Sequence, residues 1–108
     1  MKIEDEIIQS FHLMWDAFPG PVRLIDKTHT ILAANEKARS MGFIEGVKCT
    51  RVGAPEVHRG CRAAEMLRLK TAQVDRSAEG KVRGWVPVVG HEDILVHFAL
   101  VLPEKTLP

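Results

Sequence analysis

The segment ILVHFALVL (94–102) constrains the fold more than any other part of the chain. Alternate residues of a strand point to opposite faces, so one face would carry Ile94, Val96, Phe98, Leu100 and Leu102. The other face would carry Leu95, His97, Ala99 and Val101. A sheet with one face in water alternates apolar with polar residues. Because both faces of this strand are largely apolar, we expect the sheet to be covered on both sides.

An amphipathic helix is predicted over residues 2–18. Its apolar residues recur at steps of three and four, which draws one stripe along a helical surface: Ile3, Ile7, Phe11, Met14 and Phe18. Ile8 and Trp15 widen the stripe. The following FPGP (18–21) ends the helix, because proline lacks an amide donor. This helix, or a second subunit, is the expected cover for one face of the sheet.

The remaining pattern predicts two strands, small helices and then three strands. Strands are expected at 22–26, 30–34, 72–77, 81–89 and 94–102, with Pro87 at an edge or a bulge. Asn35 is a good N-cap and Gly42 a good C-cap for a short helix, and CRAAEMLRLKTA (61–72) predicts a longer one. Residues 43–58 show no clean period. The order indicates an α+β domain with one five-stranded antiparallel sheet.

Composition narrows the classes of function. A chain of 108 residues forms one domain, and 15 basic against 14 acidic residues leave a net charge of +1. No run of Lys or Arg suggests a nucleic-acid partner. No stretch approaches the roughly 18 apolar residues of a membrane span, and MKIEDEIIQSF does not read as a secretory signal. With two cysteines and no export signal, a cytoplasmic location is expected.

The segment FPGPVRLIDKTHTILAANEKARSMGF resembles the opening of a PAS domain, and GWVPVV followed by ILVHFALVLPE is similar to the final PAS hairpin. The likeness covers roughly residues 18–104 and implies a sensory or ligand-binding module. It also implies a homodimer formed through the N-terminal helix, with a signalling protein as a further partner. The expected division is a dimerisation helix (1–18), a PAS-like domain (19–104) and a tail (105–108). PEKTLP replaces the acidic-Ile-Thr motif that commonly leads into a signalling helix.

Cys49, His58 and Cys61 form the candidate metal site, within KCTRVGAPEVHRGC (48–61). His-x-x-Cys spacing lets both side chains reach one zinc or iron ion, and the fourth ligand would be His97, His91, Glu65 or water. Two alternatives remain open: a disulfide or switchable thiol pair, and two small residues that pack a loop. GVKC with a second cysteine opening the long helix also resembles a PAS subset in which such cysteines serve metal, iron–sulfur or redox roles. Iron–sulfur versions usually supply four thiolates, and this chain has two.

His97 and Trp85 are the candidate cofactor-binding residues of the apolar strands, with core packing as the alternative for both. Haem on His58 or His97 is less favoured than a metal ion, and Cys-x-x-Cys-His is absent. No phosphate loop or nucleophile elbow indicates an enzyme. A hydrolase built on Cys61 and His58 would need Asp75 or Glu65 to orient the base. The hypotheses are a ligand-binding sensor, a metal or redox switch, and a dimerisation module with an empty pocket.

Overall fold

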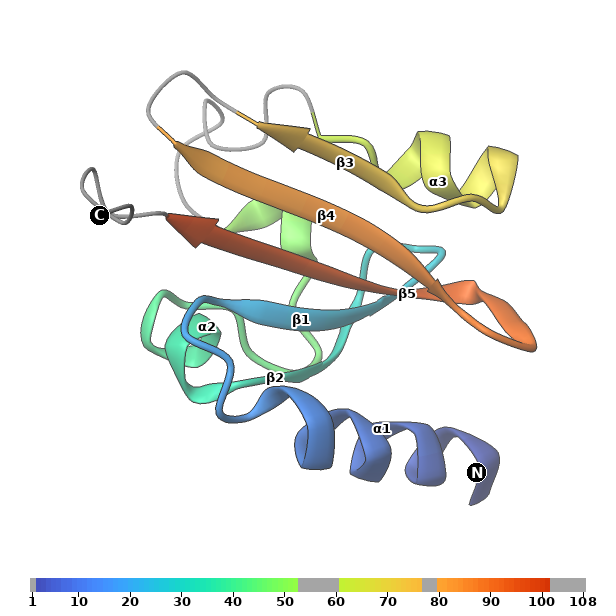
Figure 1. Ribbon diagram of the computed structural model, residues 1–108. Coiled ribbons are helices and arrows are strands. Elements are labelled where there is room, and N and C mark those ends of the chain that lie inside the picture. Colours follow the sequence, from blue (N-terminus) through green and yellow to red (C-terminus); the bar gives the residue numbers. More distant parts are fainter. Residues whose placement is uncertain (1, 53–60, 77–79, 102–108) are drawn as a thin grey trace.

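The computed structural model describes residues 2–52, 61–76 and 80–101. Its elements, in chain order, are α1 (Lys2–Trp15), β1 (Val22–Asp26), β2 (Ile31–Ala34), α2 (Glu36–Ser40), the 3-10 turn η1 (Cys49–Arg51), α3 (Ala63–Leu69), β3 (Gln73–Arg76), β4 (Lys81–Val88) and β5 (His91–Val101). Within these residues, five strands form one antiparallel sheet in the order β2-β1-β5-β4-β3 (Figure 1). The predicted α+β class with a five-stranded antiparallel sheet is confirmed.

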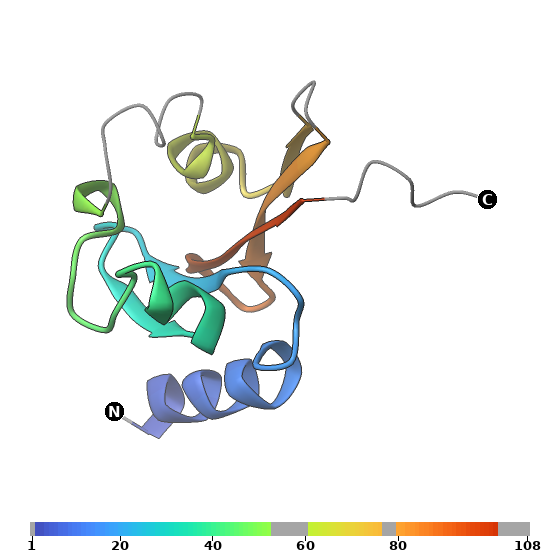
Figure 2. The same cartoon turned by 90° about the vertical axis from the view of Figure 1, so that its left-hand side faces the viewer.

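Helices cover the sheet on both sides, although unequally. Figure 2 shows α2, η1 and α3 together on one side, which we call the inner face, with α1 apart from them. A second buried cluster on the opposite, outer face joins α1 to the strands; its core is Phe11, Val22, Leu24, Ala33 and Val96. Helix α1 lies closest to β1 and β2, and its Trp15 also stacks on Phe98 of β5. The expectation that both faces of β5 are covered is confirmed for this half of the sheet.

The helix α1 presents a narrower stripe to the sheet than predicted. Phe11 is 2% exposed, and Ile7 and Trp15 pack beside it one turn away on either side. Met14, placed on the stripe by the sequence, is instead 70% exposed, and its neighbour Leu13 is 84% exposed. Helix α1 ends at Trp15, so Phe18 reaches the outer cluster from the turn that follows the helix. The predicted stripe joined Phe18 to the helix through Met14, and with Phe18 outside the helix Met14 need not face the sheet. The side chain of Ile3 lies outside the described part.

Asn35 ties three elements together. Its Oδ1 accepts hydrogen bonds from the amide of Ala38, at 3.0 Å, and from the amide of Val22, also at 3.0 Å. Its Nδ2 donates to the carbonyl oxygens of Gly20 and Trp15 at 2.9 and 3.2 Å. The predicted N-cap of α2 is therefore confirmed, and the same side chain also fixes the end of α1 against the start of β1.

The boundaries of α3 and β5 also differ from the prediction. Helix α3 ends at Leu69 because Lys70 adopts a left-handed conformation (φ 57°) as its C-cap. Strand β5 begins at His91 rather than Ile94, since Val88 pairs directly with His91 across a turn in which Gly90 has φ 84°. The register shifts between Pro87 and Val88, which confirms the predicted bulge.

Candidate ligand-binding cavity

A cavity of about 510 Å³ lies between the inner face of the sheet and the α2–η1–α3 layer. Strands β1, β4 and β5, the FPGP turn, α2, η1 and the start of α3 all contribute to its wall. Its described lining residues are Pro19, Gly20, Pro21, Arg23, Ile25, His29, Lys37, Met41, Phe43, Cys49, Thr50, Val52, Cys61, Ala63, Lys81, Arg83, His97, Ala99 and Val101. We call this space the inner cavity.

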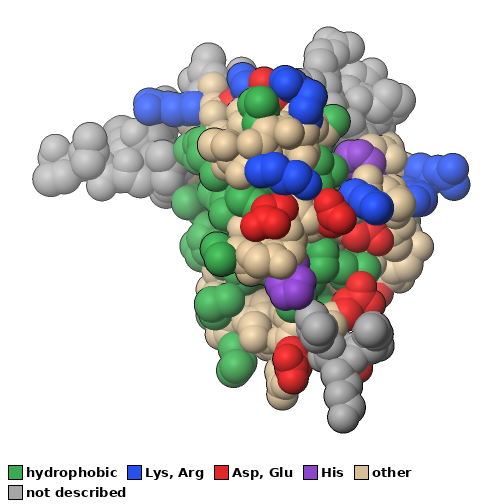
Figure 3. All heavy atoms as spheres, turned by 90° about the vertical axis from the view of Figure 1, so that its right-hand side faces the viewer, with side chains coloured by type: hydrophobic (Ala, Val, Ile, Leu, Met, Phe, Trp, Pro, Cys, Tyr) green, Lys and Arg blue, Asp and Glu red, His purple; other side chains and the backbone are tan. Residues whose placement is uncertain are grey.

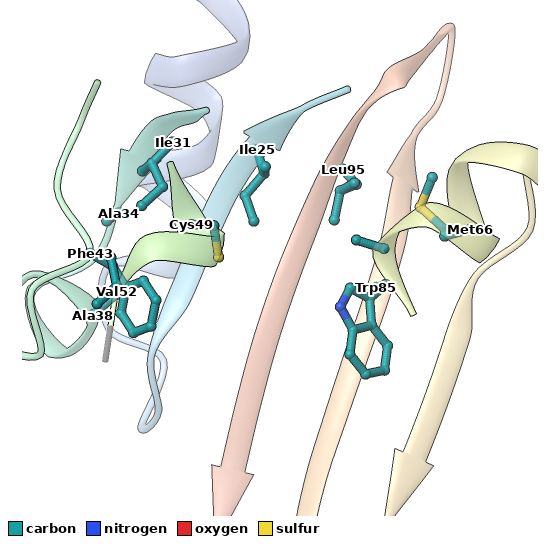
Figure 4. Packing of buried hydrophobic residues seen from close by; sticks show 11 residues of the cluster. Ile25, Ile31, Ala34, Ala38, Phe43, Cys49, Val52, Met66, Trp85 and Leu95 are labelled. Carbon is teal, nitrogen blue, oxygen red and sulfur yellow. The ribbon is translucent and has the colours of Figure 1, made fainter. Parts of the chain in front are cut away.

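The buried residues of the inner face form two groups in Figure 4. One group gathers around Phe43, Cys49 and Val52, beside β1 and β2. The other contains Trp85 and Met66, at β4 and α3. Members of the first group, with Ala63 from α3, line the inner cavity. The buried residues of this face form one cluster, and the inner cavity adjoins the part of it around Phe43, Cys49 and Val52.

A row of side chains crosses the inner face at the middle of the sheet. Arg23 of β1 is paired with His97 of β5, and His97 with Trp85 of β4. All three are almost completely buried, at 5%, 7% and 0% exposure. The rings of Trp85 and His97 stack with centroids 4.7 Å apart. Arg23 and His97 line the inner cavity, and Trp85 supports His97 from the side.

The hydrogen bonds of His97 fix its protonation. Its Nδ1 lies 2.9 Å from the carbonyl oxygen of Gly84, so Nδ1 carries the proton and donates. Burial, and then the positive charge of Arg23, lower the pKa of His97 from 6.5 to about 3. The ring is neutral at pH 7, and its Nε2 is an acceptor without a partner among the described residues.

Arg23 is a buried cation that has no anionic partner in the described part of the chain. Its Nη1 donates to the Sγ of Cys49 at 3.6 Å, and its guanidinium carbon lies 4.1 Å from the centre of the Phe43 ring. Its Nε is buried and has no hydrogen-bond partner among the described residues. Burial lowers the pKa of the guanidinium from its usual value, but an arginine remains charged at neutral pH. The wall of the inner cavity therefore holds a fixed positive charge.

The described charged residues that line the inner cavity are all basic. Lys37, Lys81 and Arg83 also line it, and none of its described lining residues is Asp or Glu. Arg83 is held by a two-pronged ion pair with Asp75, at 3.0 and 2.6 Å, which neutralises it. Arg23 is buried, whereas Lys37 and Lys81 are exposed, and among the described residues it has no carboxylate partner such as Asp75 provides for Arg83.

Cys49 and Cys61 border the same cavity, Cys49 buried and Cys61 exposed, and both are free thiols. Burial raises the pKa of the Cys49 thiol, although the charge of Arg23 opposes the shift. His58 lies outside the described residues. Among the residues that are described, no three His, Cys, Asp or Glu side chains gather as a metal site. The metal site at Cys49, His58 and Cys61 stays a prediction, and the Arg23 charge beside Cys49 works against a cation there.

The other predicted residues are placed as follows. Asp75 pairs with Arg83, and Glu65 lies 3.4 Å from Arg62 on the surface. Trp85 does not line the inner cavity. Sequence reasoning missed Arg23, the residue that gives the cavity its charge. A signal is present in the sequence, since in VRLID (22–26), predicted as a strand, an arginine stands between two apolar residues.

No protein-family model and no curated protein matches the chain. Solved structures do. The sensory box sensor histidine kinase from Vibrio cholerae has a TM-score of 0.62 at 11% identity over 94% of this chain and 92% of that one. The PAS domain of Bordetella pertussis BvgS has a TM-score of 0.62 at 15% identity, covering 93% and 89%. The phage VqmA–DPO complex has a TM-score of 0.66 at 17% identity, covering 92% of this chain and 54% of that one.

These likenesses, with the strand order of the sheet, show that the chain has the PAS fold. The predicted resemblance is confirmed at the level of the fold. The cysteine-containing subset is not tested by these structures and stays a prediction. In the described residues no helix has the length and apolar character to cross a membrane.

Proposed function

We propose that the chain is a sensory module that binds a small organic molecule in the inner cavity and passes the signal to a partner protein. The observation that carries this proposal is the polar pair Arg23 and His97 buried in the wall of a cavity of about 510 Å³. Ligand pockets combine an apolar lining with a few placed polar groups, and this volume lies within their usual range. The likeness to a sensory box kinase and to a VqmA–DPO complex supports the same reading.

A cavity-filling variant tests this proposal. Ala99 is 7% exposed and lines the cavity from β5, so Ala99→Phe would place a ring inside it. Leu100→Phe puts the same ring on the opposite face of the same strand and serves as the matched control. We expect native mass spectrometry to find an organic molecule retained by the purified wild type and by Leu100→Phe, and lost from Ala99→Phe. Ligand-free wild type that no compound of a broad library stabilises would leave only the dimerisation module with an empty pocket.

Dimerisation is the second part of the proposal. Leu13 and Met14 are exposed on α1, and Val74 of β3 is 62% exposed on the outer face. Figure 3 shows hydrophobic side chains gathered along the left of the view, the side of the outer face, with charged ones toward the centre and right. Apolar surface of this kind is typical of protein interfaces. A second copy of the chain would cover the part of the outer face that α1 leaves open.

Light scattering on a double variant, Leu13→Glu with Met14→Glu, tests the dimer. We expect a monomer with unchanged far-ultraviolet circular dichroism, because both side chains are exposed. Deletion of residues 1–18 is a poorer test, since it also removes the buried Phe11. If the double variant stays dimeric at low micromolar concentration, the exposed side chains of α1 do not form the interface.

A metal or redox switch is the alternative function, supported by the presence of Cys49 and Cys61 at one cavity. Elemental analysis of anaerobically purified protein, with thiol titration, distinguishes it. The switch predicts one metal ion per chain, or two thiols that oxidise as a pair. An enzymatic role has no support from the fold neighbours, which are sensory domains.

A further inference from the structure

The geometry points to the class of ligand: a small organic acid whose carboxylate pairs with Arg23 and whose hydroxyl or N–H group, next to the carboxylate, donates to Nε2 of His97. The inference rests on the proposed function, since it names the molecule that the inner cavity would sense. Three features of the cavity wall carry it: the unpaired cation, the neutral acceptor beside it, and the apolar remainder.

The first feature is the missing countercharge. A buried cation without an anion is expensive, because it has left water without gaining a Coulombic partner. Arg23 is 5% exposed, and its contacts are a thiol, held neutral by burial, and the face of Phe43. Its Nε finds no hydrogen-bond partner in the part of the chain that the structure describes. A carboxylate in the inner cavity would supply the charge and the acceptor oxygens that a guanidinium matches best.

The charged residues around the cavity and the burial of Arg23 both favour an anionic ligand. No described lining residue is acidic, while Lys37 and Lys81 lie on the same wall. A field of one sign around a cavity raises the local concentration of the oppositely charged solute. A cationic or metal ligand would meet the same field as repulsion.

The second feature is the acceptor. His97 stands directly opposite Arg23 in the β1–β5 register, and opposite side chains of antiparallel strands begin about 5 Å apart. Nε2 of His97 accepts, because Nδ1 already donates to Gly84. A carboxylate oxygen has no proton to offer it. The ligand therefore needs a donor within one or two bonds of its carboxylate, as a 2-hydroxy acid has.

The third feature is the rest of the wall. Ile25, Phe43, Val52 and Ala63 line the inner cavity near the polar pair. They fit an aliphatic or aromatic remainder, whose burial would add affinity in proportion to its apolar area. The size of the inner cavity, about 510 Å³, leaves room for such a group beyond the acid.

The experiment uses titration calorimetry on the full chain with three 2-hydroxy acids of rising size: lactate, 2-hydroxyisocaproate and mandelate. Each acid is compared with its neutral amide and with the acid that lacks the hydroxyl. The variants are Arg23→Met, which keeps length without charge, and His97→Phe, which keeps the ring stack on Trp85. Lys37→Met is the matched control, because Lys37 is an exposed cation on the same wall.

We expect at least one hydroxy acid to bind, with its amide and its deoxy acid each weaker by about tenfold or more. Arg23→Met should abolish binding of the acid, His97→Phe should remove the preference for the hydroxyl, and Lys37→Met should change the affinity by less than about threefold. Ligand-free Arg23→Met should also unfold at a higher temperature than the wild type, since it no longer buries an unpaired charge.

The inference is overturned if no acid binds up to about 10 mM, if amides bind as tightly as acids, or if Arg23→Met binds acids like the wild type. A strong loss of thermal stability in Arg23→Met would also contradict it, because Arg23 would then have a structural partner. The identity of a molecule retained by the purified protein separates the two claims. If the retained molecule is neutral, the inference of an acid ligand is wrong while the proposed ligand-binding function is supported. If the inner cavity binds no molecule, both are wrong.

Discussion

The two faces of the sheet differ in how completely they are packed. On the outer face, Phe11 of α1 packs with Val22, Leu24 and Val96 in one buried apolar cluster. On the inner face, the same strands carry Arg23 and His97, and about 510 Å³ is left unfilled. A chain of this length can leave such a cavity only if other contacts hold the sheet. The comparison teaches that packing on the outer face stabilises a sheet whose inner face contains a cavity.

The largest expected effect comes from the outer face. Phe11→Ala should lower the free energy of unfolding by about 3–5 kcal/mol, because a buried ring is lost and the cavity left behind does not fill. Urea unfolding followed by circular dichroism measures it. Leu13→Ala, two residues along the same helix and 84% exposed, should change stability by about 0.5 kcal/mol or less. Equal effects would mean that α1 does not seal the outer face.

The inner face should respond to pH through His97. Its pKa in the folded chain, about 3, lies below its ordinary 6.5, so the unfolded chain binds the proton more tightly. The contribution of neutral His97 to the stability of the folded chain is therefore present above pH 6.5 and is lost as the pH falls toward 3. In that window the free energy of unfolding of the wild type should fall by roughly 1 kcal/mol per pH unit relative to that of His97→Phe.

Unfolding curves at matched pH values isolate this difference from the titration of carboxylates, which both proteins share. Parallel stability profiles for the two proteins would show that His97 is solvated or carries its proton. Because His97 lies on the inner face, opposite Arg23, the comparison predicts that this acid sensitivity arises there.

The smallest expected effects divide the outer face itself. Val22→Thr, in the half covered by α1 and fully buried, should cost about 1–3 kcal/mol, because a hydroxyl is placed among apolar groups. Val74→Thr is the same change in the uncovered half and should cost about 0.5 kcal/mol or less in the monomer. If Val74→Thr instead weakens the dimer in light scattering, the second copy covers β3.

Much of the fold could be predicted because its signals are local. The apolar run ILVHFALVL marks β5, the FPGP turn ends α1, and Asn35 before a short helix predicts its N-cap. Met14 was wrongly placed because its exposure depends on where α1 ends and how Phe18 folds back, neither of which a helical stripe records. The end of α3 depended on the backbone of Lys70, a residue whose type does not favour φ 57°.

The candidate site could be predicted only in part, because it is assembled from distant residues. Cys49 was singled out for metal chemistry, and the structure places its sulfur 3.6 Å from Arg23, 26 residues away. The register that sets Arg23 opposite His97 follows from antiparallel pairing of the first and last strands. No spacing along the chain shows that pairing.

The sequence by itself determined that this protein would be an α+β sheet covered on both faces. Alternation, caps and breakers act over a few residues and need no partner to be read. Only the tertiary structure decided that one face would be packed and the other left hollow around a buried charge. That outcome depends on which side chains meet across strands, and the free energy of a charge depends on what surrounds it rather than on its place in the chain.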